Sequence, residues 1–186
     1  MPDQGLKVDI ARTFDAKEIQ KMADQLAVNI LVGFPSGRQH VPTVHKKETE
    51  GKNGRKKKEF AGYDGESPEA IKSIETADLA LELHYGSART PARPFLEDGI
   101  NSQLGNIKKA FQAEAQKANN GGQPNWSKVG TMAVGAVQEF VRGDYYKENI
   151  PNSQTTIDYK GSDRPLIDSG DLLNSLTFVV QKGANK

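Results

Sequence analysis

Residues 160–180, KGSDRPLIDSGDLLNSLTFVV, constrain the fold more than any other segment, because they combine a turn, an apolar insertion, a helix start and a strand. The turn formers at 161–163 come first, and Pro165 restricts the residue before it to extended geometry. We therefore expect Pro165, Leu166 and Ile167 to enter the hydrophobic core as an apolar peg.

The same segment predicts a short helix and a strand directly after the peg. Asp168 is expected to accept hydrogen bonds from free amides of a helix that begins at Ser169, where its negative charge suits the positive helix end. Three leucines then share one helical face, and residues 177–180 are rich in strand formers. We call residues 165–170 the clasp, and its predicted structural residues are Pro165, Leu166, Ile167, Asp168 and Gly170.

Further elements are predicted in the first half of the chain. Apolar residues alternate over 6–10, which indicates a strand, and a helix is expected over 15–26. The apolar run over 28–34 predicts a strand that is buried on both faces and ends at a Pro-Ser-Gly turn. A helix start at 67–69 leads toward Gly86, although Thr76 also fits a fresh start, so one kinked helix and two short helices are both compatible.

Two longer helical patterns dominate the second half. Apolar residues recur every three or four positions over about 95–117 and about 126–146, and a short Gly- and Pro-containing linker separates them. Such helices form an antiparallel pair. Between Gly86 and the first of them, two prolines keep residues 89–96 extended as an arm. The whole chain, residues 1–186, is thus predicted to be a single α+β domain in which a small mixed or antiparallel sheet packs against helices.

Residues 38–66 form a predicted insertion, either a long basic loop or an extended hairpin, because they hold few apolar side chains. Between residues 38 and 58, eight basic residues stand against only Glu48 and Glu50, a local charge of +6 in a chain of net charge +1. Three interpretations remain open: a solvated insertion, a surface for DNA phosphates, or a surface for an acidic protein. The basic residues are Arg38, Lys46, Lys47, Lys52, Arg55, Lys56, Lys57 and Lys58.

Composition and spacing argue against several classes of protein. The sequence has no cysteine, so it cannot form disulfides or use a catalytic thiol. It shows no apolar run near about 18 residues and no signal-peptide pattern, so we expect a cytosolic protein without membrane contact.

Catalytic and metal-binding motifs are equally weak. Ile167-Asp168-Ser169-Gly170 resembles the catalytic loop of aspartic proteases, but these enzymes need two such carboxylates and the chain offers one copy. His40, His45 and His84 lack the spacing of a metal site, and no phosphate-binding loop pattern occurs. We therefore expect no enzyme activity and no cofactor.

Three groups of residues, in this order, resemble the tail-completion family of long-tailed bacteriophages. The first is Gly33-Phe34-Pro35-Ser36-Gly37 after a strand, and the second is His84-Tyr85-Gly86 followed by Pro91-Ala92-Arg93-Pro94-Phe95-Leu96. The third is Thr156-Ile157, then Lys160-Gly161-Ser162-Asp163 and Pro165-Leu166-Ile167-Asp168-Ser169-Gly170. The likeness spans roughly residues 28–180 and omits the basic loop, which is longer and richer in lysine than the family pattern.

The resemblance implies a structural virion protein of the phage neck. Such a protein would form a homo-oligomer, a hexameric ring, that joins the tail tube protein to the head connector and lets DNA pass. It would be assembled in the host cytoplasm and located in the virion. Either the arm contributes to the subunit interface, through Arg89, Pro91, Arg93, Pro94 and Phe95, or it is an ordinary crossover between helices. As an alternative function, residues 38–58 fit a nucleic-acid-binding accessory module.

Overall fold

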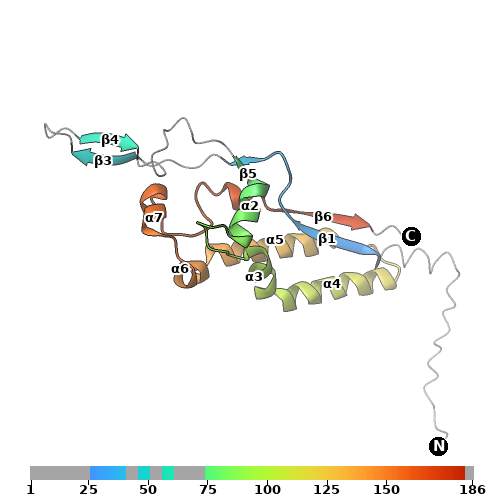
Figure 1. The fold of residues 1–186 in the computed structure, drawn as a ribbon. Coiled ribbons are helices and arrows are strands. Elements are labelled where there is room, and N and C mark those ends of the chain that lie inside the picture. The colour runs from blue at the N-terminus through green and yellow to red at the C-terminus, as the bar shows by residue number, and fades with distance from the viewer. Residues whose placement is uncertain (1–25, 41–45, 51–55, 61–73, 183–186) are drawn as a thin grey trace, which may run out of the picture.

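The computed structural model describes residues 26–40, 46–50, 56–60 and 74–182, and these form an α+β fold of short antiparallel sheets and helices (Figure 1). Each sheet in the described residues has two strands, paired β1 with β6, β2 with β5, and β3 with β4. The strands are β1 (Val28–Gly33), β2 (Gln39–His40), β3 (Lys46–Glu50), β4 (Lys56–Phe60), β5 (Ile74–Glu75) and β6 (Thr177–Lys182). The helices are α2 (Thr76–Tyr85), α3 (Phe95–Ser102), α4 (Leu104–Asn119), α5 (Trp126–Arg142), α6 (Tyr145–Asn149), α7 (Gln154–Lys160) and α8 (Asp171–Ser175).

Helix α5 lies at the centre of the fold and contacts α3, α4, α6 and the β1–β6 sheet (Figure 1). Asn125 caps it, because its side chain accepts a hydrogen bond from the backbone amide of Lys128. Two glycines allow close packing. A Cβ atom at Gly99 of α3 would lie 2.6 Å from Cα of Val137, and one at Gly130 of α5 would overlap the ring of Phe178 in β6.

The predicted helix pair is present, but both predicted helices are interrupted. The second ends at Arg142, and α6 begins separately at Tyr145. Helices α4 and α5 pack against each other, and the rings of Phe111 and Trp126 lie 4.9 Å apart between them. Glu114 ties the connecting loop to α4, because its carboxylate accepts from the amide of Asn125 at 2.7 Å. The first predicted helix is divided into α3 and α4 at Gln103, whose φ of −121° and ψ of 15° are not helical.

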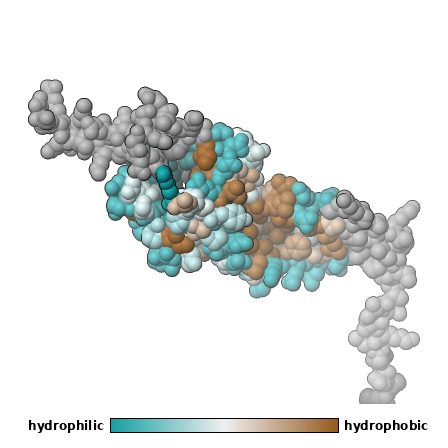
Figure 2. Space-filling view, viewed as in Figure 1, coloured by the Kyte–Doolittle hydropathy of each residue, from teal (hydrophilic) through white to brown (hydrophobic). Residues whose placement is uncertain are grey.

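The β1–β6 sheet covers α5 with one face and leaves the other face open. Its register pairs Leu31 with Val179, and these two side chains are 51% and 54% exposed. The prediction of a strand at 28–34 is therefore confirmed, whereas burial of both its faces is wrong. A second layer is missing from this side of the sheet in the described residues. Figure 2 shows apolar surface over the part of the molecule where β1 and β6 lie.

The clasp enters the core largely as predicted. Pro165 and Leu166 are buried, whereas Ile167 is only partly buried against the same core. Leu166 has a φ of 61°, a left-handed conformation that is costly for a leucine and that buried packing must hold in place. The leucines of the following segment, Leu172, Leu173 and Leu176, are all buried, and β6 follows.

The predicted role of Asp168 as a helix cap is wrong. Helix α8 begins at Asp171, its N-cap residue is Gly170 with φ of 90°, and no side chain caps it. Gly170, and not Asp168, therefore occupies the position directly before the helix. The carboxylate of Asp168 instead lies 3.7 Å from Nε2 of His40.

Some predictions fall outside the described residues, namely the strand over 6–10, the helix over 15–26 and the helix start at 67–69. The basic insertion contains an antiparallel hairpin, β3–β4, which confirms the hairpin alternative for its described part. Figure 1 shows this hairpin apart from the helices. Over the described residues, no helix combines the length and the apolar character that crossing a membrane requires.

Candidate binding cavity between the arm, helix α7 and the clasp

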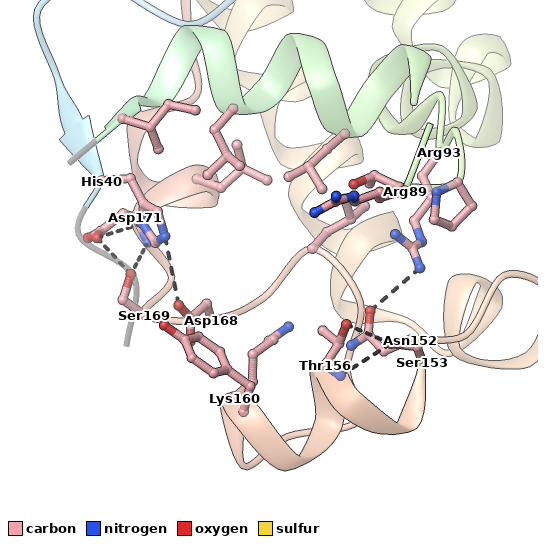
Figure 3. A pocket seen from close by; sticks show the side chains of 18 of the residues that line it. His40, Arg89, Arg93, Asn152, Ser153, Thr156, Lys160, Asp168, Ser169 and Asp171 are labelled. Carbon is pink, nitrogen blue, oxygen red and sulfur yellow. Dashed lines mark hydrogen bonds and ion pairs between the residues drawn. The ribbon is translucent and has the colours of Figure 1, made fainter. Parts of the chain in front are cut away.

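A cavity of about 550 Å³ lies where α2, the arm, α7 and the clasp meet (Figure 3). The arm and the clasp, which are separate segments of the sequence, both line this cavity. The arm contributes Arg89, Thr90, Pro91 and Arg93, and the clasp contributes Leu166, Asp168, Ser169 and Gly170. The other lining residues are His40, Ile74, Leu79, Leu83, Pro151, Asn152, Ser153, Thr156, Tyr159, Lys160, Asp171 and Leu172.

The arm reaches the cavity because the chain reverses sharply after α2. Gly86 ends that helix with φ of 77°, and a Cβ atom there would lie 2.7 Å from the backbone nitrogen of Ala92, so the close approach requires glycine. The amide of Ser87 donates to the carbonyl of Thr90 at 2.8 Å and closes the turn. The amide of Arg93 then donates to the carbonyl of Leu83 at 2.9 Å, which fixes the arm alongside α2.

Arg93 forms the inner wall of the cavity and is only 3% exposed. Its guanidinium donates from Nε to the carbonyl of Ile150 at 3.0 Å and from Nη2 to the carbonyl of Pro151 at 3.1 Å. Nη2 also lies 3.5 Å from Oδ1 of Asn152. Burial lowers the pKa of Arg93, and nearby Tyr146 opposes this shift.

These contacts limit which of the predicted interface residues can touch another subunit. Arg93 and Phe95 are buried within their own chain, at 3% and 0% exposure, and hold the arm to the core. Arg89 and Pro91 are exposed and Pro94 is partly exposed. Arg89 and Pro91 are therefore accessible for contact with a neighbouring subunit, whereas Arg93 and Phe95 hold the arm against the core.

The opposite wall is built around His40, which is 6% exposed at the end of β2. Its Nδ1 lies 3.2 Å from Oδ2 of Asp171, and its Nε2 lies 3.7 Å from Oδ2 of Asp168. The hydroxyl of Ser169 donates to Asp171 at 2.6 Å. This hydrogen bond, followed by the contact with His40, lowers the pKa of Asp171. This wall connects β2, which lies at the start of the basic insertion, to the clasp.

Lys160, the last residue of α7, lies between the two walls (Figure 3). Its Nζ donates to the carbonyl of Arg164 at 2.8 Å. Burial lowers the pKa of Lys160, nearby Arg93 lowers it further, and Asp168 opposes the shift. The amine is therefore partly desolvated, and Arg93 and Asp168 both lie close enough to affect its pKa.

Neither a hydroxyl activated by a histidine nor a metal cluster is found among the described residues that line the cavity. The hydroxyl of Ser169 donates to a carboxylate and is thus not directed at the imidazole of His40 as a nucleophile activated by a base would be. The described residues contain no group of three or more histidine, aspartate or glutamate side chains arranged to hold a metal. What the cavity offers is an apolar floor with cationic groups on one side and a histidine between carboxylates on the other.

Five of the eight basic residues predicted on the insertion lie along the hairpin, namely Lys46, Lys47, Lys56, Lys57 and Lys58. Arg38 directly precedes β2, and Lys52 and Arg55 fall outside the described residues. The register of β3 and β4 places Glu48 opposite Lys58, Glu50 opposite Lys56, and Lys47 opposite Glu59. Five lysines therefore share the two strands with three glutamates, and each glutamate has a lysine as its register partner. The remaining lysines on the strands are Lys46, opposite Phe60, and Lys57, opposite Thr49. The charge available to an anionic partner is smaller than a count of basic residues alone indicates.

The sequence predictions missed helix α7 and its contribution to the cavity. The cap signals were present, because Ser153 accepts from the amide of Thr156 at 3.2 Å and Gly161 ends the helix with φ of 67°. A seven-residue helix carries too few apolar positions to show a periodic pattern. Thr156 and Lys160 belong to the third group of family-like residues but were given no place in a site, and Asn152 was not singled out.

Comparison with models of protein families, with curated proteins and with solved structures finds no match to this chain. The function is therefore inferred from the sequence motifs, the exposed sheet and the cavity.

Proposed function

We propose that this protein is a structural subunit of the phage neck, similar to tail-completion proteins, which assembles into a ring between the tail tube and the head connector. The ring, most simply a hexamer, surrounds a channel through which DNA passes. In this proposal the protein is assembled in the host cytoplasm, resides in the virion, has no enzymatic activity and requires no cofactor.

The observation that carries the proposal is the open face of the β1–β6 sheet. Leu31 and Val179 are register partners, point away from α5 and are each about half exposed. A two-stranded sheet is marginal by itself, and here both strands have a free outer edge among the described residues. An exposed apolar face next to free strand edges is a surface that another protein chain commonly covers.

The ordered motifs add support that is independent of the sheet. The turn at 33–37 directly follows β1, the arm motif lines the cavity, and the third motif runs from α7 through the clasp to α8. The three motifs therefore occupy the ends and connections of the elements that build the core. If the resemblance extends to the fold, the three motifs should occupy related positions in the structure. Motifs that matched by chance would have no reason to do so.

The hairpin β3–β4 fits the same proposal as an element that meets DNA or an acidic protein surface. It carries Lys46 and Lys57 without a glutamate as register partner, and repetition around a ring multiplies even a modest charge. A nucleic-acid-binding accessory module that acts through residues 38–58 remains the second candidate. That candidate predicts salt-dependent DNA binding by an isolated subunit, which is lost when Lys56, Lys57 and Lys58 are replaced by glutamine.

The oligomeric state of sheet-surface variants tests the proposal. Leu31→Glu and Val179→Glu place a charge on the open face without disturbing the buried face, so we expect them to remain folded and to shift native mass spectra from a ring toward the monomer. Leu81→Glu is the matched control, because Leu81 is 59% exposed on α2, outside the sheet. Identical spectra for all three variants and the unmodified protein, or a persistent monomer in every case, would refute the proposal.

A further inference from the structure

Arg93 is a buried cation for which the described residues provide no counter-ion. Among the residues that the structure describes, no carboxylate forms an ion pair with it, and its acceptors are two backbone carbonyls and one amide oxygen. These contacts use Nε and Nη2, and Nη1 has no acceptor within the described residues. Burying an unpaired charge is expensive, and an anion bound in the cavity would offset that cost.

Two further cations line the same cavity. Arg89 enters from the arm, near Arg93, and Lys160 extends from α7 between the two walls (Figure 3). Neither forms an ion pair with a carboxylate in the described part of the chain, although Asp168 is close enough to influence Lys160. Asn152, Ser153 and Thr156 add amide and hydroxyl groups beside these cations. This side of the cavity is therefore built to accept a single anionic group with several donors.

The floor of the cavity has a different character. Ile74, Leu79, Leu83, Pro151, Leu166 and Leu172 present aliphatic surface. On the far side, Asp168 and Asp171 flank His40. An extended polyanion such as DNA would meet two carboxylates and an apolar floor, whereas an aliphatic side chain next to one carboxylate would satisfy both the floor and the cations. A volume of about 550 Å³ lies within the usual range of pockets that bind small ligands.

We propose that this cavity binds a short peptide segment of another protein that bears a carboxylate beside aliphatic side chains. The carboxylate is held by Arg89, Arg93 and Lys160, and the aliphatic groups cover the floor formed by Leu79, Leu83 and Leu166. The inference rests on the cavity and does not depend on the assembly of a ring. It assigns to the arm and the clasp a shared role in holding a partner.

A pair of blocked peptides tests the proposal directly. One has the sequence acetyl-Ala-Leu-Asp-Leu-Ala-amide, and in the other asparagine replaces aspartate. Titration of the full-length protein, followed by NMR chemical shifts, is expected to show that the aspartate peptide binds at least about tenfold more tightly. Its shifts should centre on Thr156, Lys160 and Leu166. Equal affinity of the two peptides, or no binding up to about 10 mM, would overturn the proposal.

Substitutions locate the carboxylate. Arg89→Gln and Lys160→Met should each reduce the preference for aspartate by about threefold or more. Lys128→Gln should leave the preference unchanged, because Lys128 is an exposed residue of α5 that does not line the cavity. Arg89 is exposed, so its substitution keeps the test valid even if Lys160→Met destabilises α7. A preference that survives both cavity substitutions would exclude the assigned contacts. Inorganic phosphate and a twelve-base-pair DNA duplex serve as competitors, and displacement of the peptide by either at lower concentration would identify a phosphate site instead.

Discussion

Substitution of two glycines in one helix separates close packing from helix propensity. Gly130 and Gly135 both lie in α5, and neither has a positive φ. A Cβ atom at Gly130 would overlap the ring of Phe178, at 2.5 Å from Cγ, whereas a Cβ atom at Gly135 would meet nothing within 4 Å. The same change to alanine should therefore have opposite effects at the two positions.

The expected magnitudes follow from these contacts. Extra volume in a packed site costs about 1–3 kcal/mol, and alanine in a helix interior recovers about 0.5–1 kcal/mol relative to glycine. Gly130→Ala should thus destabilise the protein by about 1–2 kcal/mol, because the Phe178 ring is attached to β6 and cannot move without disturbing the sheet. Gly135→Ala should stabilise it by about 0.5–1 kcal/mol. For a chain of this size these values correspond to a decrease of Tm by about 2–8 °C and an increase by about 1–4 °C.

Differential scanning calorimetry at one protein concentration measures both effects. Circular dichroism of each variant before heating checks that the helical content is unchanged. If Gly130→Ala melts at or above the temperature of the unmodified protein, the close contact between α5 and β6 is wrong. If Gly135→Ala is strongly destabilising, the space around that position is filled by something that the described residues do not include.

Three further predictions concern polar contacts. Tyr146→Phe removes the hydroxyl that donates to Asp98 at 2.5 Å, so urea unfolding should show a loss of about 1–2 kcal/mol, and an unchanged midpoint would contradict this contact. The pKa of Asp171 is lowered in the folded state, so its stabilising effect is present above its ordinary value of 3.8 and is lost as the pH falls through the lower folded value. Asp171→Asn should therefore lower Tm at pH 6 and have progressively less effect below about pH 4, and a Tm difference that is constant with pH would refute the assignment. In the hairpin, Lys57→Gln should weaken DNA retention at low salt more than Lys58→Gln, because Lys58 is the register partner of Glu48, and the reverse order would contradict the register.

Local patterns predicted most of the elements and little of their assembly. The apolar spacing in α5 and the strand formers of β6 express local preferences, so both were found with nearly correct bounds. The break at Gln103 was not predicted, because helical periodicity continues across it in the sequence. The error at Asp168 has a similar origin. Aspartate before a helix usually caps it, but Gly170 adopts a left-handed conformation that only the folded chain reveals.

The cavity could be predicted only in part. The arm and the clasp each stood out in the sequence because of their prolines, glycine and charged residues, and both do line the site. Their proximity depends on the reversal at Gly86 and on contacts of Arg93 with carbonyls more than fifty residues away, which no local pattern encodes. Burial of β1 was overestimated for a related reason, since composition does not show how many layers cover a strand.

Cryo-electron microscopy of the purified full-length protein tests whether it assembles into a ring. We predict closed rings with an open channel, in which the β1–β6 face around Leu31 and Val179 lies at the contact between neighbouring subunits. Monomers, or closed dimers without a channel in which this face remains solvent-exposed, would contradict it.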